Sequence, residues 1–97
     1  MWIVIAYDIA DDRRRSKVVK VLEGICERVQ ESVFECEAEW QRVDRLIGEL
    51  QSCIAGAEDS IRVYGIPSGG AARMRILGQG RDVRASWDYI GDEGGEG

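Results

Sequence analysis

Asp8 is the first side chain in the sequence suited to chemistry, because it follows directly after the apolar run at residues 2–7. An ionised carboxylate at the mouth of a buried strand must be paired, hydrogen-bonded or metal-bound to tolerate its desolvation. Two interpretations are open: Asp8 is a ligand for a hard cation such as Mg²⁺, or it accepts backbone N–H bonds where the chain turns. One carboxylate alone is a poor magnesium site, but a two-fold dimer would supply a second copy.

A cluster of cations comes a few residues after Asp8. Its members are Arg13, Arg14, Arg15 and Lys17. They fall at the start of an expected helix, where the free N–H groups attract anions and the dipole disfavours cations. A surface that collects cations there is suited to phosphate groups, so Asp8 is predicted to hold the metal and the cluster to bind a nucleic-acid backbone. The alternative is a solvated face neutralised by Asp11 and Asp12.

The composition restricts the chemistry further. The 97 residues contain no histidine, which excludes His-based triads and nearly every zinc site built on imidazole. The net charge of -5 does not suggest nucleic acid, yet residues 11–20 carry five basic and two acidic side chains. Cys26, Cys36 and Cys53 show no C-x-x-C spacing. We expect them to be small core residues in a reducing cytosol, without a disulfide framework.

The elements that must position these residues begin with a strand at residues 2–7, predicted to be central and covered on both faces. It is too short to be a membrane span. A helix is expected at residues 12–23, capped by Asp11 or Asp12 and stopped by Gly24. Residues 28–37 are extended in character and predict one long strand or two short ones that meet at a bend.

The second half of the chain predicts another helix and a strand pair. Apolar residues at helical spacing indicate an amphipathic helix from Ala38 that ends by Gly56. Strands are expected at residues 61–64 and 74–77, on either side of a turn. Residues 83–90 are weakly strand-like.

This element order predicts an α+β fold with two helices on one face of an antiparallel sheet. We expect one domain over residues 1–90 and a disordered Gly/acidic tail at 91–97. The opposite face of the sheet needs a cover, which dimerisation would supply.

Three blocks of sequence, at residues 2–15, 28–36 and 59–64, resemble the CRISPR-associated Cas2 family, the small subunit of the spacer-acquisition complex. The resemblance covers residues 1–80. It implies a ferredoxin-like fold and a homodimer in which residues 83–90 add to the partner's sheet. A ferredoxin-like order needs two strands between the helices, which only a break near Glu31 and Ser32 could supply.

The resemblance also implies a function. It implies a Mg²⁺-dependent endonuclease acting on RNA or DNA, with Asp8 as the catalytic and metal-binding residue, and a spacer integrase as partner. Arg14 and Arg15 match the family's basic positions, and Ser32 and Phe34 match its S-V-F block. Tyr7, Ser32 and Phe34 are candidate supporting residues, although ordinary strand roles are open for Tyr7 and Ser32.

The main alternative is a non-catalytic adaptor that binds DNA, bridges integrase dimers and uses Asp8 only architecturally. A toxin-like ribonuclease of related fold and a small-molecule regulatory domain are weaker hypotheses, the last because it has no need for a basic first turn.

Overall fold

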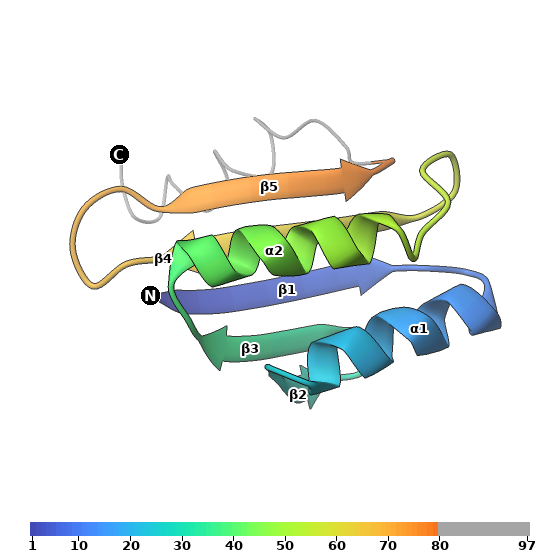
Figure 1. Ribbon diagram of the computed structural model, residues 1–97, viewed down its shortest axis with the longest axis horizontal. Helices are drawn as coiled ribbons and strands as arrows, with labels where there is room; N and C mark the ends of the chain where they lie inside the picture. The colour runs from blue at the N-terminus through green and yellow to red at the C-terminus, as the bar shows by residue number, and fades with distance from the viewer. Residues whose placement is uncertain (80–97) are drawn as a thin grey trace.

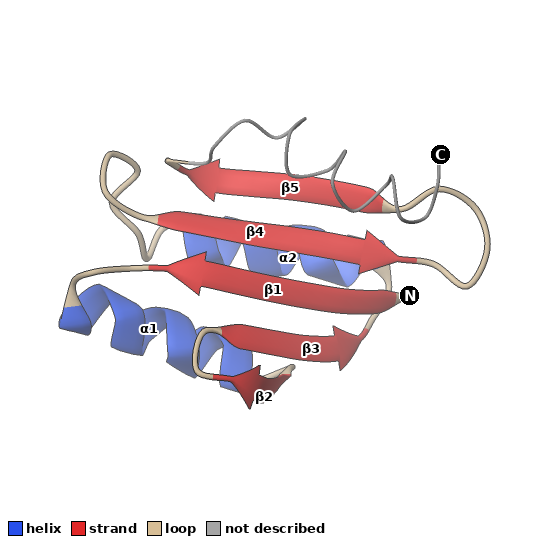
Figure 2. Cartoon of the chain, turned by 180° about the vertical axis from the view of Figure 1, so that it is seen from behind, coloured by secondary structure: helices blue, strands red, loops and turns tan. Residues whose placement is uncertain are grey.

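A computed structural model describes residues 1–79 of the chain as a five-stranded antiparallel sheet with both helices on one face (Figures 1 and 2). The strand order across the sheet is β2-β3-β1-β4-β5, so the first strand lies at its centre. In chain order the elements are β1 (Trp2–Asp8), α1 (Asp12–Glu23), β2 (Glu27–Gln30), β3 (Val33–Glu37), α2 (Trp40–Gln51), β4 (Ser60–Ile66) and β5 (Arg73–Gly78).

The segment at residues 28–37 is two strands rather than one. β2 and β3 form an antiparallel hairpin, and the chain turns between them at Glu31 and Ser32. The first six elements therefore follow the βαββαβ order of a ferredoxin-like fold, which confirms the predicted α+β class, and β5 extends the sheet.

Local contacts explain where the helices begin and end. The Asp11 carboxylate accepts a bond from the Arg14 backbone N–H at 2.9 Å and caps α1, which spans the predicted residues. α2 starts later than the expected Ala38, because the backbone N–H of that residue donates to the Met1 carbonyl at 3.0 Å. α2 also ends before the expected Gly56. At its C-terminus the Ser52 hydroxyl donates to the Glu49 carbonyl at 2.7 Å.

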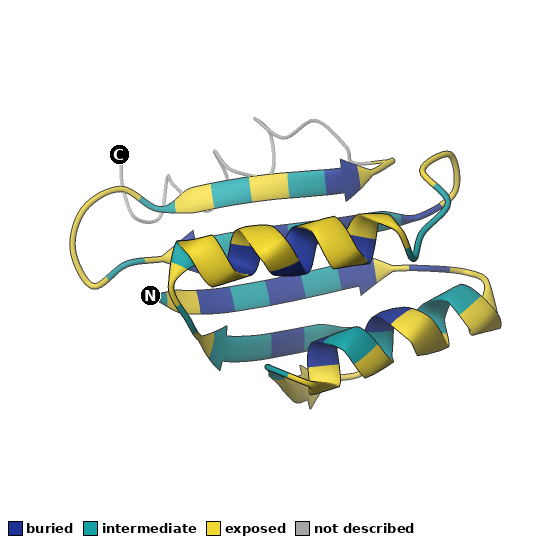
Figure 3. Cartoon of the chain, in the orientation of Figure 1, coloured by how far each residue is buried: buried dark blue, intermediate teal, exposed yellow. Residues whose placement is uncertain are grey.

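The core lies between the sheet and the helices, and buried residues alternate along the central strands (Figure 3). Ile3, Ile5 and Tyr7 of β1 face the helices and are buried. The intervening residues of the strand, among them Val4 and Ala6, point to the other side.

We call this second side the open face; it carries Trp2, Val4, Ala6 and Asp8 of β1 and Tyr64 and Ile66 of β4. Within residues 1–79 no helix covers it (Figure 2). Trp2 and Ile66 are 43% and 47% exposed there. Among residues 1–79 the first strand is therefore covered on one face, and the expected cover of the second face stays a prediction.

Neither helix in the described part of the chain has the length and apolar character needed to cross a membrane. The strand expected at residues 83–90 and the tail expected at 91–97 lie outside the described residues.

Candidate functional site

A cleft of about 600 Å³ opens where β1 ends, between α1 and the β2–β3 turn. Its charged and hydroxyl-bearing lining residues are Tyr7, Asp8, Arg15, Ser16, Lys20, Arg28, Glu31 and Ser32. Three cations face two carboxylates in this lining, so the cleft favours an anionic ligand such as a phosphate. The sequence-predicted residues Tyr7, Asp8, Arg15 and Ser32 meet here.

Asp8 ends β1, opposite Ser60 of β4, and its side chain is exposed. The argument from desolvation at the mouth of a buried strand is therefore wrong for the single chain. The alternative role as a backbone acceptor gains no support either, because within residues 1–79 no N–H donates to its carboxylate. Asp8 also lines a second hollow of about 410 Å³ beside β4.

A metal at Asp8 needs further ligands. Among the described residues, no three His, Cys, Asp or Glu side chains lie close enough together to hold a metal ion. Carboxylate oxygens are the hard donors that Mg²⁺ prefers, so Asp8 suits the ion chemically once a second carboxylate and a phosphate are supplied.

Tyr7 and Arg28 form one wall of the cleft. The Tyr7 hydroxyl donates to the Glu31 carbonyl at 2.9 Å, and the Tyr7 backbone N–H donates to the Ser32 carbonyl at 3.1 Å. Arg28 Nη2 donates to the Tyr7 hydroxyl at 3.3 Å. Tyr7 thus holds both the β2–β3 turn and a cation in place beside Asp8.

Phe34 is fully buried and does not line the cleft. Its ring lies 6.3 Å from that of Tyr7, and the guanidinium of Arg28 lies 5.4 Å from its centroid. Phe34 therefore supports the site from the core, since it packs under the two residues that form the wall.

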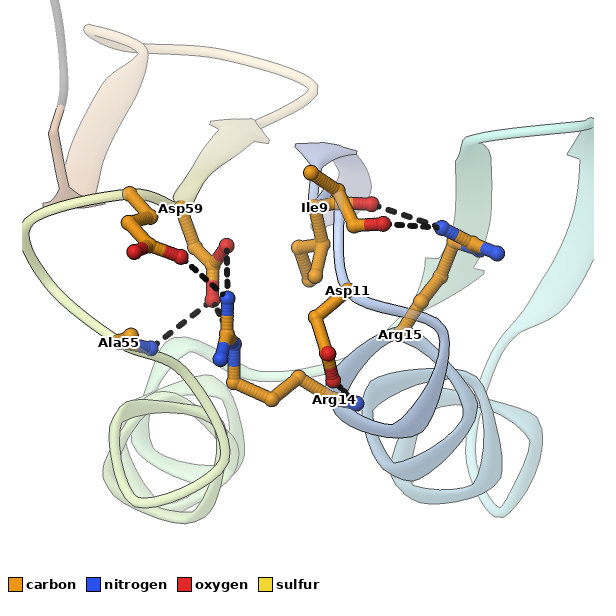
Figure 4. Close-up of polar contacts among 8 residues, drawn as sticks. Ile9, Asp11, Arg14, Arg15, Ala55 and Asp59 are labelled. Atoms are coloured by element: carbon orange, nitrogen blue, oxygen red, sulfur yellow. Dashed lines mark hydrogen bonds and ion pairs between the residues drawn. The ribbon is translucent and has the colours of Figure 1, made fainter.

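Arg15 is tied to the loop that follows Asp8 (Figure 4). Its Nη1 donates to the Ile9 carbonyl at 2.9 Å and to the Ala10 carbonyl at 3.4 Å, and its Nη2 pairs with Asp12. These bonds fix the start of α1 against the end of β1 and leave Arg15 in the lining of the cleft.

Arg14 reaches in the opposite direction, toward the loop before β4 (Figure 4). Its Nε donates to Asp59 Oδ2 at 2.7 Å, and its Nη2 pairs with Glu58 at 2.9 Å. Asp59 is fully buried and also accepts from the Ala55 backbone N–H at 2.8 Å. The nucleic-acid contact expected of Arg14 stays a prediction, while the structure gives it a second role in joining α1 to this loop.

Burial alone would raise the pKa of Asp59, but the hydrogen bonds from Arg14 and Ala55 outweigh it and hold the pKa below its ordinary value of 3.8. A carboxyl with a lowered folded pKa contributes stability above 3.8 that is lost as the pH falls through the folded value. Asp59→Asn is therefore expected to lower the free energy of unfolding by about 2 kcal/mol at neutral pH.

Urea unfolding of wild type and Asp59→Asn checks this prediction. The difference between them should shrink in acid below the folded pKa, because the wild-type carboxyl is then protonated too. If the difference in the free energy of unfolding is the same at neutral pH and in acid, the lowered pKa of Asp59 is contradicted.

Arg13 and Lys17 are exposed, and together with Lys20 they recur at the spacing of one helix face. Within residues 1–79 none of the three forms an ion pair. The predicted cation cluster is thus divided: Arg14 and Arg15 bind within the chain, and Arg13 and Lys17 face solvent.

Two residues that shape the site were not singled out from the sequence: Arg28 lines the cleft, and Asp59 anchors Arg14. Each begins a block that carries the family resemblance, but the partners that give it a role lie elsewhere in the chain. Lys20, one of the cations of residues 11–20, also lines the cleft.

A ferredoxin-like sheet with a cationic cleft beside an exposed carboxylate defines a small α+β protein suited to polyanionic ligands. The profile of the family described as CRISPR associated protein Cas2 matches residues 1–74. The chain belongs to the CRISPR-associated Cas2 family.

Individual relatives support the same family assignment. The CRISPR-associated endoribonuclease Cas2 3 of Chloroflexus aurantiacus is 44% identical over 93% of this chain and 97% of its own length. The CRISPR-associated endoribonuclease Cas2 of Thermus thermophilus is 38% identical over 80% of this chain and 83% of its own. Among solved structures, Streptococcus pyogenes Cas2 superposes with a TM-score of 0.64 at 28% identity, covering 71% of this chain and 89% of that one.

Proposed function

We propose that this chain is a Mg²⁺-dependent endonuclease that cleaves RNA or DNA phosphodiesters and acts in CRISPR adaptation. The observation that carries the proposal is the presence of the exposed residue Asp8 among those that line a cationic cleft. Relatives named CRISPR-associated endoribonucleases support it. Cleavage of RNA and DNA oligonucleotides by wild type and Asp8→Asn at equal Mg²⁺ tests it.

The residues of the cleft have separate roles in this proposal. Arg15, Lys20 and Arg28 hold the phosphate backbone, and the bonds of Arg15 to the loop after β1 fix it close to Asp8. Asp8 holds the metal. When bound, Mg²⁺ supplies an activated water and offsets charge on the phosphate.

The second carboxylate comes from a second copy of the chain in this proposal. Asp8 lies at the end of the open face, which carries exposed Trp2 and Ile66. A homodimer formed through this face, with residues 83–90 exchanged onto the partner's sheet, would cover these side chains and bring two Asp8 residues to the interface.

The second candidate is the non-catalytic adaptor that bridges dimers of a spacer integrase. The exposed stripe of Arg13, Lys17 and Lys20 favours it, because such a stripe gives salt-sensitive backbone contacts without any metal. Spacer acquisition in cells separates the nuclease from the adaptor. If the chain is an adaptor, acquisition continues in Asp8→Asn and is lost when Arg13 and Lys17 become Glu. Three free thiols suit a location in the reducing cytoplasm for either function.

The double variant Arg13→Glu/Lys17→Glu is expected to weaken duplex binding at least about tenfold and to lower the salt slope by about 1 for each cation removed. Both side chains are exposed, so the fold should be kept. Affinities measured over a series of salt concentrations check this. The matched control is Arg42→Glu/Arg45→Glu on α2, and an equal loss there would show that only the net charge matters.

A further inference from the structure

Cys26 and Cys36 are brought together across the β2–β3 hairpin. Cys26 directly precedes β2, whose first residue, Glu27, pairs with Glu35, the residue before Cys36; one further step in the same register would set Cys26 opposite Cys36. Both side chains are partly buried and pack against the hydrophobic core. Directly opposed residues of antiparallel strands have Cα atoms about 4.5 or 5.5 Å apart. Both values lie in the range of roughly 4.4–6.8 Å that a disulfide spans.

We propose that Cys26 and Cys36 are a site of oxidative modification, where a small-molecule disulfide converts the two thiols into an intrachain bridge that locks β2 against β3. The inference does not depend on the proposed nuclease or adaptor function.

The hairpin is the part of the sheet where such a bridge has most effect. β2 is an edge strand whose four residues are all exposed, and its pairing with β3 shifts register between Arg28 and Gln30. Arg28 and the turn residues Glu31 and Ser32 line the cleft. A covalent bond at the open end of the hairpin therefore restrains one wall of that cleft.

The chemistry runs by two thiol–disulfide exchanges with oxidised glutathione. The Cys36 thiolate attacks a glutathione sulfur, forms a mixed disulfide and releases one glutathione thiolate. The Cys26 thiolate then attacks Cys36 Sγ and releases the second, so two protein thiols are oxidised and one glutathione disulfide is reduced to two thiols.

The order of attack follows from the environment of Cys26. Burial, and next the neighbouring Cys36 thiol, raise the pKa of the Cys26 thiol. Cys26 is therefore the slower nucleophile and acts second. Bridge formation should accelerate as the pH rises.

Peptide mapping of the full-length protein tests the proposal. The protein is treated with oxidised glutathione, free thiols are blocked with iodoacetamide, and peptides are analysed without reduction. We expect a cross-linked peptide joining Cys26 to Cys36, lighter by two hydrogens than the two thiol peptides, in wild type and in Cys53→Ser. The proposal is overturned if Cys26 and Cys36 both remain free for alkylation, or carry only glutathione, after prolonged treatment.

Hydrogen exchange provides the second measurement. In oxidised Cys53→Ser protein, the amides of residues 27–30 are expected to exchange about tenfold more slowly than in the reduced protein. Cys36→Ser and Cys26→Ser, treated in the same way, should show no such slowing. Equal exchange in the bridged and reduced protein would overturn the locking of β2.

Discussion

Asp8→Asn is expected to lower the rate of Mg²⁺-dependent cleavage by about a thousandfold, or about 4 kcal/mol of transition-state stabilisation. The amide keeps the size of the side chain but removes the charge that holds the ion. Single-turnover cleavage of a labelled oligonucleotide at saturating Mg²⁺ measures the effect.

Stability serves as the first control. Asp8 is exposed, so the variant should unfold at the same urea concentration as wild type. Asp44→Asn, an exposed change on α2, should cleave at the wild-type rate. If Asp8→Asn cleaves as fast as wild type, a contaminating nuclease becomes the simpler source of activity and the adaptor function is favoured.

Phe34→Ala is expected to lower the free energy of unfolding by about 3–5 kcal/mol, because it leaves a cavity where a fully buried ring packs against Tyr7. Small domains have only about 5–15 kcal/mol of stability, so part of the protein should be unfolded near physiological temperature. Urea unfolding followed by circular dichroism measures the change.

Phe34→Leu is the matched variant, since it keeps an apolar side chain in the same space and should lose much less stability. Activity should fall in proportion to the unfolded fraction for both variants. A variant that remains fully folded but inactive would contradict the supporting role in the core and place the ring at the reacting groups.

Hydrophobic periodicity predicted both helices and the strands β1, β4 and β5, because the core pattern is local in sequence. The hairpin of β2 and β3 was only one of two interpretations, since no Gly, Pro or Asn marks the turn. The turn is set instead by hydrogen bonds from Tyr7 to the carbonyls of Glu31 and Ser32, which come from a distant strand.

The candidate site was predictable in position but not in detail. Asp8 and the nearby cations lie at the end of β1 where the cleft opens, yet the sequence does not separate the roles of Arg14 and Arg15. Arg14 differs because Asp59, its buried partner, lies 45 residues away in the chain. The pairing of Cys26 with Cys36 was hidden for the same reason, because it depends on the register of the hairpin.

Metal-binding stoichiometry tests the central claim most directly: that the Asp8 carboxylates of two chains hold the catalytic ion. Mn²⁺, a spectroscopic substitute for Mg²⁺, can be titrated into the full-length protein and counted by electron paramagnetic resonance. We predict one tightly held ion for every two chains, and none in Asp8→Asn. Binding that is unchanged in Asp8→Asn would contradict the claim.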